Sequence, residues 1–403
     1  MTDAVVQATH SYRARWVVPV VGEALDGGAV TVVDGRIASI DRHAPAGAVD
    51  LGDVALLPAW INAHCHLEFS ELTQPLGEPG QPLPDWIKTV IAWKRGRTTS
   101  SRGAIEQGLR ESHAGGVAAI GEIGTGDAWD ATLVPPLDVT VFQETICLHP
   151  DRFVESMQGA KHFINERSLG ATWQTGLSPH APYTVHPELL DHLLDLAARR
   201  QLPVAMHLAE SREELELLAS GQGALRSMLD GVGIIWPAEE MRSFRRPLAY
   251  LERLARAPRS LVVHGNYLAS DEIAYIAQQR ERMTVVYCPR THAYFQHERH
   301  PLVELLHSGA AVAIGTDGRG SNPDLDLLAE LRCVAREFPE LSPRKIIELG
   351  TIDGARALGI HHRLGSLEVG KQAAFVAVPL DSVEQGDPYA AILSSSGSGK
   401  IVL

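Results

Sequence analysis

Two histidines, His64 and His66, flank Cys65 directly after the largely apolar residues 58–63. Alternate residues of a β-strand point to the same side, so a strand at this position would direct both imidazoles into one space. The pattern alone is weak, because a chain with 18 histidines contains about one such pair by chance. Whether the pair does chemistry therefore depends on which other side chains the fold brings to it.

Eight apolar segments rich in β-branched residues recur along the chain and alternate with stretches of helical periodicity. Strands that are apolar on both faces and alternate with helices are typical of a parallel sheet covered by helices. Eight such strands predict an α/β fold, the closed (β/α)8 TIM barrel. The eight segments are residues 54–62, 117–123, 139–145, 172–179, 203–210, 260–266, 283–289 and 310–317.

The ends of these segments define a candidate site, because active sites of (β/α)8 barrels gather at the C-terminal ends of the strands. One histidine at a strand end is more often structural than a ligand. Histidines at four of the eight strand ends, with an aspartate at the last, are not expected by chance. In chain order the candidates are His64 with His66, Glu122, Glu144, His180, His207, His264, Cys288 and Asp317.

The two ends of the chain differ from the region between them. Residues 16–57 contain short strand-like runs, and the pair Asp34-Gly35 marks a hairpin turn. The tail returns to strand-like sequence. We therefore predict a small β-domain built from residues 1–57 and 363–403, with the barrel at residues 58–362.

The composition is that of a globular protein with a large core, since 45% of the 403 residues are apolar and 21% are charged. A formal net charge of −13 disfavours nucleic acid as a partner, because proteins that bind it present a basic surface. The four cysteines are scattered, which favours reduced thiols and a cytoplasmic location. No apolar stretch reaches the length of a membrane helix, about 18 residues, and the N-terminus does not read as a signal peptide.

The strand-end motifs resemble those of the amidohydrolase superfamily, and in particular its aminohydrolase branch of deaminases and triazine chlorohydrolases. The resemblance is carried by the HxH pair, "HLAE" at His207, "VVHGN" at His264 and "GTDGRGSN" at Asp317, with "LSPHAPYTV" and "GSLEVGKQAAF" in support. The chain departs from the family where the usual Ala-Asp pair reads Ala373-Ala374. It departs again at "CPRTHAYF", a variant that is similar to sequences grouped with aminodeoxyfutalosine deaminases.

The resemblance implies one divalent metal ion held by His64, His66, His207 and Asp317, with zinc expected and Fe2+ as the alternative. Three imidazoles and a carboxylate suit zinc, which lowers the pKa of a bound water to about 7 and so makes a hydroxide nucleophile. Members with two metals bridge them with a carboxylated lysine. This chain has six lysines and none at the end of the third or fourth strand, so we expect a single ion.

The resemblance also assigns catalysis to Glu210, His264 and Asp317. Glu210 follows His207 by three residues, where a carboxylate that is not a ligand can move a proton from the water to a ring nitrogen of the substrate. His264 would orient the hydroxide. Asp317 would help to carry a proton to the leaving group, which departs as ammonia.

Substrate-binding positions are predicted at His180, Trp86, Arg290 and Arg319. His180 and Trp86 match positions where relatives contact the substrate or place an aromatic lid, with helix packing as the alternative for Trp86. Arg290 and Arg319 follow neighbouring strands, so they could bind a substrate carboxylate together or pair with nearby acids such as Asp324. The sequence leaves open the roles of Glu68, Glu122 and Glu144, and of the loop that contains His292, His297 and His300.

We expect a hydrolytic deaminase of an amino-heterocycle, with a 6-aminopurine nucleoside such as aminodeoxyfutalosine as the leading substrate. The nearest alternative is the same machinery acting on a triazine, cytosine, guanine or S-adenosylhomocysteine type of substrate, chlorohydrolases included. The missing bridging lysine disfavours a cyclic amidase, and the presence of Glu210 and His264 disfavours a barrel that merely binds metal. The partner is a small molecule. Family members often form homodimers, and the sequence itself leaves the oligomeric state open.

Overall fold

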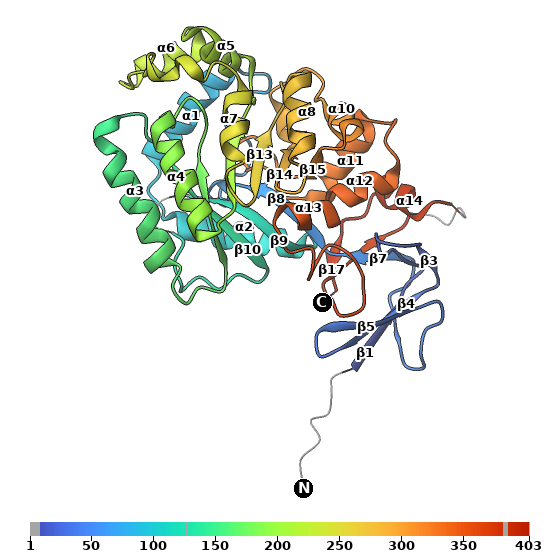
Figure 1. Ribbon diagram of the computed structural model, residues 1–403. Helices are drawn as coiled ribbons and strands as arrows, with labels where there is room; N and C mark the ends of the chain where they lie inside the picture. The colour runs from blue at the N-terminus through green and yellow to red at the C-terminus, as the bar shows by residue number, and fades with distance from the viewer. Residues whose placement is uncertain (1–8, 126–127, 382–385, 403) are drawn as a thin grey trace. The chain divides into compact units, whose positions relative to one another are not determined.

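The computed structural model describes residues 9–125, 128–381 and 386–402 (Figure 1). Its central element is an eight-stranded sheet whose strands follow one another in chain order, and β10 to β15 pair in parallel. The predicted (β/α)8 fold class is confirmed. The strands are β8 (Trp60–Cys65), β9 (Val117–Gly124), β10 (Asp138–Thr145), β11 (Gln174–Pro179), β12 (Val204–Leu208), β13 (Ser260–His264), β14 (Met283–Tyr287) and β15 (Ala311–Ile314).

Hydrogen bonds between the last strand and the first close this sheet. The amides of Thr316 and Asp317, just beyond β15, both donate to the carbonyl oxygen of His64 in β8, at 3.1 Å each. Cys65 and Asp317 form a parallel bridge at the same place. Gly315 permits the approach, because a Cβ atom there would lie 2.8 Å from the His64 carbonyl oxygen. The closure therefore puts the end of the last strand beside the histidine pair.

Burial explains the apolar character of the predicted strands, since every residue of β12, β13 and β14 is buried. The helices between strands are amphipathic, as α4 illustrates: five of its leucines are buried. It begins after His186, whose Nδ1 atom accepts the Glu188 amide at 3.2 Å, and ends at Gln201 in a left-handed conformation. The helices are α1 (Leu83–Gly96), α2 (Ser101–Ala114), α3 (Phe153–His162), α4 (Pro187–Arg200), α5 (Arg212–Ser220), α6 (Ala224–Gly231), α7 (Pro247–Leu254), α8 (Ser270–Gln278), α9 (Pro289–Tyr294), α10 (Leu302–Ser308), α11 (Leu327–Glu337), α12 (Pro343–Leu349), α13 (Ile352–Ala357) and α14 (Pro388–Ser394).

The chain forms two compact units. One comprises residues 63–110 and 120–325 within the described ranges, and all the candidate site residues lie in it. The other comprises the described residues up to 62, residues 111–119 and those from 326 onward. The predicted domain boundaries at residues 57 and 362 stay a prediction, as does the cytoplasmic location. Among the described helices, none combines the length and apolar composition needed to cross a membrane.

The second unit contains two small sheets built from both ends of the chain, as the sequence predicted. One has the order β5-β4-β1-β6 and the other β17-β16-β7-β2-β3. Their shared core includes Val17, Val30, Ile37, Leu56 and Phe375. The strands are β1 (Thr9–Arg13), β2 (Trp16–Val17), β3 (Leu25–Asp26), β4 (Ala29–Val33), β5 (Arg36–Asp41), β6 (Val49–Asp50), β7 (Val54–Pro58), β16 (Phe375–Pro379) and β17 (Lys400–Ile401).

Two local features of these sheets bear on the sequence predictions. The hairpin between β4 and β5 turns at Asp34 and Gly35, which both have a positive φ, of 51° and 73°. This is the geometry of a two-residue hairpin turn, so the predicted turn is confirmed. The predicted first barrel segment, residues 54–62, is in fact two strands, because β7 pairs with β16 and the chain changes sheet at Ala59.

We predict that Gly315→Ala destabilises the protein by about 1–3 kcal/mol, the usual cost of overpacking a tight contact, because the added Cβ would push β15 away from β8. Gly159→Ala is the matched control. Gly159 is an exposed residue inside α3 with nothing within 4 Å of the added Cβ, so alanine there should stabilise by about 0.5–1 kcal/mol. Chemical denaturation of the two variants measures both effects. Equal stability of Gly315→Ala and wild type would contradict the tight closure.

Candidate active site

Three histidine side chains converge at the C-terminal ends of β8 and β12. Ligand-type nitrogen atoms of His64, His66 and His207 all lie within 4.8 Å of one another, and the Nε2 atoms of His66 and His207 are 3.2 Å apart. His64 lies in β8 and His66 directly follows that strand, so their two-residue spacing puts both rings on one side. The predicted meeting of the first and fifth strand ends is therefore present.

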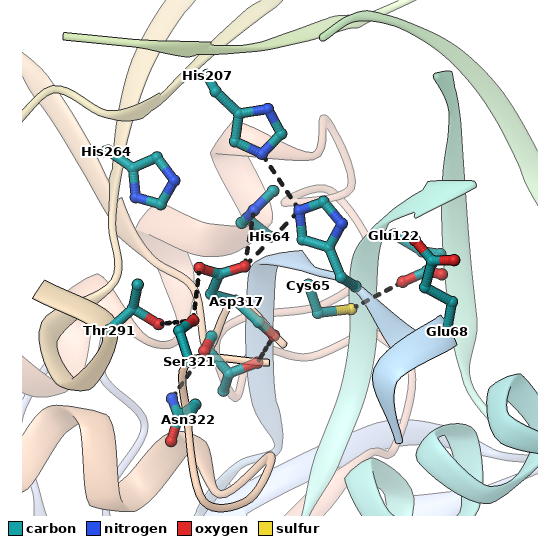
Figure 2. Close-up of polar contacts among 12 residues, drawn as sticks. His64, Cys65, Glu68, Glu122, His207, His264, Thr291, Asp317, Ser321 and Asn322 are labelled. Atoms are coloured by element: carbon teal, nitrogen blue, oxygen red, sulfur yellow. Dashed lines mark hydrogen bonds and ion pairs between the residues drawn. The ribbon is translucent and has the colours of Figure 1, made fainter. Parts of the chain in front are cut away.

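Asp317 adds a carboxylate to these histidines (Figure 2). Its Oδ1 atom lies 3.7 Å from Nε2 of His64 and 3.7 Å from Nε2 of His66, and Ser321 Oγ donates to its Oδ2 atom at 3.2 Å. Burial raises the pKa of the Asp317 carboxyl, but the hydrogen bond with His64 and the electrostatic attraction of the surrounding imidazoles outweigh it and hold the pKa well below its usual range. Asp317 is therefore an anion at neutral pH.

His66 and His207 are held in the neutral form that metal coordination requires. Burial lowers the pKa of His66 and of His207 well below the usual range, and neighbouring imidazoles lower both further. The Nδ1 atom of His207 lies 3.0 Å from the carbonyl oxygen of His180. A carbonyl only accepts, so the ring proton is on Nδ1 and Nε2 keeps its lone pair for a ligand. Three imidazoles and one carboxylate are a donor set that fits one divalent ion such as zinc.

Glu210 and His264 form a polar pair beside this donor set. The Nε2 atom of His264 lies 3.5 Å from Oε1 of Glu210, and the side chains are 4% and 9% exposed. The His264 ring stacks on that of His207 with centroids 5.5 Å apart. Burial, and next the charge of Asp317, raises the pKa of the Glu210 carboxyl well above its usual range. A carboxyl with a raised pKa holds a proton more readily than an ordinary glutamate, which favours a role in general acid–base catalysis.

The loop that carries Glu210 is held by a second buried carboxyl, that of Glu214. Its oxygens accept the backbone amides of Ala209 at 2.8 Å and of Glu210 at 2.9 Å. Ala209 has a left-handed φ of 55°, and Ser211 caps α5 by accepting the Glu214 amide at 3.2 Å. Asn266 donates its side-chain amide to the Glu210 carbonyl at 2.9 Å. The direction of Glu210 is therefore set by backbone hydrogen bonds on both of its sides.

Glu122, whose role the sequence left open, lies behind the histidine pair and not in the wall of the cavity described next. It accepts the Leu67 amide at 2.9 Å, and the Sγ atom of Cys65 is 3.3 Å from the same carboxylate oxygen (Figure 2). Burial raises the pKa of the Glu122 carboxyl well above its usual range. Its contacts fix the turn that follows His66.

The polar groups open into a cavity of about 310 Å³. Two apolar walls face this space, one from α1 and one from α6 with the segment that follows it. The first wall consists of Leu83, Trp86, Ile87, Val90 and Ile91, and the second of Met228, Leu229, Val232 and Ile234. Trp86, predicted as an aromatic lid, therefore lines the cavity, and it also donates its Nε1 hydrogen to the Gly320 carbonyl at 3.3 Å.

Four more polar residues line the same cavity. Lys94 Nζ is 2.7 Å from Oε1 of Glu68, a buried carboxylate. His180 Nε2 is 3.9 Å from Oε1 of Glu144. Burial lowers the pKa of His180 to about 3 and raises the pKa of Glu144 to about 7, so His180 is uncharged at neutral pH and this contact is not an ion pair. Among the described lining residues Lys94 is the only lysine or arginine, and Glu68 matches its charge.

The two arginines predicted to bind substrate are not among the residues that line the cavity. Arg290 Nη2 lies 2.5 Å from Oδ1 of Asp324, which is the ion pair that the sequence offered as the alternative. Arg319 Nη1 donates to the carbonyl oxygens of Leu72 at 3.2 Å and of Pro323 at 2.7 Å. Their placement does not support the predicted contact with a substrate carboxylate, because a position after a strand fixes the Cα atom and not the direction of a long side chain.

Sequence reasoning missed Lys94 and Glu214. Lys94 lies on α1, so a search of strand ends does not reach it. Glu214 had a signal, since Ser211 followed three residues later by a glutamate is the pattern of a helix N-terminus. That pattern predicts the cap of α5 but not the two amides that the carboxylate accepts.

Comparison with known proteins covers the eight-stranded sheet and the whole candidate site. Residues 55–403 match the Amidohydrolase family. The chain is 28% identical to a 5-methylthioadenosine/S-adenosylhomocysteine deaminase of Moorella thermoacetica, over 93% of this chain and 88% of that protein. It is 30% identical to an aminodeoxyfutalosine deaminase of Deinococcus radiodurans, over 84% of this chain and 83% of that protein. A solved adenosine deaminase of Xanthomonas campestris with bound zinc superposes with a TM-score of 0.77 at 26% identity, over 97% of this chain and 90% of that chain.

We predict that the purified protein holds about one equivalent of a divalent transition metal, because its convergent donors form one four-ligand set. His207→Ala should weaken binding by at least about 10-fold, the smallest loss expected when the environment of a ligand is disturbed. His192→Ala, which removes an exposed histidine of α4, is the control. Metal analysis after dialysis against a chelator gives the stoichiometry. Two tightly held equivalents, or full occupancy in His207→Ala, would contradict this donor set.

We predict that Glu214 makes stability fall as the pH rises. Burial raises the pKa of its carboxyl in the folded protein to about 7, above the usual value of 4.5. Between these two values the folded state binds the proton that the unfolded state has lost, so the free energy of unfolding decreases as pH increases, by at most about 1.4 kcal/mol per pH unit. The wild type minus Glu214→Gln difference in unfolding free energy isolates the effect from pH 4 to 8. A difference that rises or stays flat across this window would refute it.

Proposed function

The chain belongs to the Amidohydrolase family, as its strand-end motifs predicted, and on this premise we propose that it is a metal-dependent hydrolytic deaminase of a 6-aminopurine nucleoside. The observation that carries the proposal is a single cavity in which neutral histidines, an ionised aspartate and a buried carboxyl meet two apolar walls. The relatives described above are named as deaminases of adenosine-type compounds, which supports both the reaction and the class of substrate.

His64, His66, His207 and Asp317 would hold the ion, which we propose to be zinc, with Fe2+ as the alternative. When bound, such an ion lowers the pKa of a coordinated water to about 7 and so supplies a nucleophile at neutral pH. The convergence of these four side chains, the neutral state of His66 and His207 and the anionic state of Asp317 support the assignment. In the part of the chain that the structure describes, no second group of this kind was found.

Glu210, Asp317 and His264 would move the protons. Water adds to the carbon that bears the amino group, and Glu210 transfers one proton of this water to the adjacent ring nitrogen. Asp317 carries the second proton to the amino group, which leaves as ammonia. His264, with Nε2 at 3.5 Å from Glu210, would hold the attacking oxygen by a hydrogen bond during the addition. The raised pKa of Glu210 supports its role, because an ordinary glutamate is almost fully ionised at neutral pH, whereas a general acid must carry a proton.

Aminodeoxyfutalosine is the leading substrate, because the Deinococcus relative of that name is 30% identical to this chain, against 28% for the Moorella deaminase. A neutral 5′-alkylthio nucleoside such as 5′-methylthioadenosine is the second candidate, and a specific observation favours it. The walls from α1 and α6 are apolar, and the charge of Lys94 is already matched by Glu68. A carboxylate at the far end of a substrate would therefore have to compete with Glu68 for that lysine.

The experiment that tests the proposed function measures ammonia release by the zinc-loaded protein from a panel of heterocycles. The panel contains adenosine, 5′-methylthioadenosine, S-adenosylhomocysteine and aminodeoxyfutalosine, with cytosine, guanine and a chlorotriazine as contrasts. The proposal expects the highest kcat/KM on one of the four adenosine-type compounds. If only cytosine, guanine or the chlorotriazine is turned over, the proposed substrate class is wrong and the chain carries out the alternative chemistry of the same branch.

We predict that Glu210→Gln retains the metal and loses activity by about 10²-fold or more, the usual contribution of general acid–base catalysis. Glutamine keeps the shape of the side chain and cannot transfer a proton. Glu213→Gln, on the neighbouring turn of α5 and outside the cavity wall, is the control and should behave like wild type. Metal analysis and steady-state kinetics on the best substrate give the two readouts. Near-normal turnover of Glu210→Gln would remove the glutamate from the proton pathway.

A further inference from the structure

The backbone of His264 takes an unusual conformation where β13 ends. Its φ is 70°, in the left-handed region, and Gly265 follows with a φ of 63°. The left-handed region is sterically disfavoured for a residue with a side chain, and such a conformation persists only where the surroundings hold it. Because the side chain leaves from this same Cα atom, whatever holds the backbone also directs the imidazole toward Glu210.

Both polar ends of the peptide unit between His264 and Gly265 are hydrogen-bonded. Its N–H, from Gly265, donates to the Leu208 carbonyl oxygen at 3.0 Å. Its C=O, from His264, accepts a hydrogen bond from Nε2 of His300 at 2.9 Å. Rotation of this unit would change ψ of His264 and φ of Gly265 together, so these bonds, with a further one from the Gly265 amide to the Val263 carbonyl oxygen at 3.2 Å, fix the way in which the chain leaves the strand.

His300 is itself firmly placed. It is 2% exposed, and its ring stacks on Tyr287 of β14 with centroids 4.0 Å apart. Burial lowers the pKa of His300 to about 3, so the ring is neutral at pH 7. Since the partner is a carbonyl oxygen, the single ring proton must be on Nε2. His300 does not line the cavity within the described chain, so any effect on catalysis has to pass through another residue.

We propose that His300 is a positioning residue, which donates its Nε2 hydrogen to the His264 carbonyl, locks the 264–265 peptide and thereby aims the His264 imidazole at Glu210 and the attacking water. The inference rests on the proposed function for the catalytic role of His264. It assigns a function to His300, which lies between α9 and α10 in the histidine-rich segment whose role the sequence left open.

Matched substitutions test the donor. His300→Gln keeps an N–H near the position of Nε2, whereas His300→Asn carries the same amide on a side chain too short to reach the carbonyl, and His300→Leu removes it. His292→Leu is the control, because it removes a buried imidazole 5.9 Å from that of His300 and leaves the bond to His264 in place. We expect kcat to fall about 10²-fold in the Leu and Asn variants, the effect of misplacing a reacting group by about 1 Å. KM and metal content should stay unchanged, with recovery in His300→Gln and wild-type behaviour in His292→Leu.

A double variant separates positioning from general stability. If His300 acts through His264, then His264→Ala/His300→Leu has the same kcat as His264→Ala alone. The proposal would be overturned if the kcat losses of His264→Ala and His300→Leu multiply in the double variant. It would also be overturned if His300→Gln and His300→Asn lose kcat equally. If His300→Leu does not fold, two other measurements test the proposal by the same criteria. They are the comparison of kcat between His300→Gln and His300→Asn, and the kcat of the double variant His264→Ala/His300→Asn.

A crystal structure of His300→Leu or His300→Asn gives a readout that needs no substrate. We expect the 264–265 peptide to rotate and the φ of His264 to leave the left-handed region. If the wild type deaminates no adenosine-type compound, the proposed function fails, but a rotated peptide still supports the positioning contact. A peptide that keeps its wild-type orientation without the His300 donor overturns the inference whatever the substrate is.

Discussion

The closure of the eight-stranded sheet between β15 and β8 is the contact on which the site depends. One carbonyl oxygen, that of His64, accepts the amides of both Thr316 and Asp317, and the missing side chain of Gly315 lets the two strands approach. In an open sheet of the same strand order, the histidines of the first strand and the aspartate of the last would lie at opposite edges. The donor set therefore results from closure, and neither motif could form it alone.

Burial then sets the charge states of the side chains that the closed sheet brings together. Water is largely excluded from His66, His207, His264 and Glu210, and each of these groups is driven toward its neutral form. Asp317 is the exception, because the imidazoles around it stabilise the carboxylate. The proposed divalent ion, held by three imidazole nitrogens and one carboxylate oxygen, would keep a net positive charge, which is the condition for acidifying a bound water. The pKa of Glu210 is raised first by burial and next by the negative charge of Asp317, because a carboxyl beside an anion holds its proton more tightly.

How far the sequence could predict the site depends on what positions each residue. His64, His66, His207 and Asp317 follow strands, and parallel strands in a barrel bring their C-terminal ends together, so a periodic pattern was enough to group them. Arg290 and Arg319 also follow strands, but their long side chains turn to Asp324 and to backbone carbonyls, which no pattern records. Lys94 comes from a helix face, and the hydrogen bond of His300 joins the segment between α9 and α10 to the end of β13, so both depend on packing that appears only in three dimensions. Sequence reasoning also missed the change of sheet at Ala59, because the strands on both sides of it are apolar and only their pairing in three dimensions tells them apart.

The polar groups and the apolar walls of the cavity come from different elements, and this has a consequence for how substrate preference can change in evolution. The proposed reacting groups lie at or just beyond strand ends that hydrogen bonds and burial hold in place, whereas the apolar walls come from α1 and from α6 with its following segment. Substitutions in those helical walls would change the shape offered to the distal part of a substrate without touching the proposed proton pathway. Substrate preference can therefore change with little effect on the chemical step. Two copies of such a gene could differ in substrate after substitutions at only a few helix positions. An architecture of this kind favours a lineage in which one reaction is retained while the compounds it acts on change.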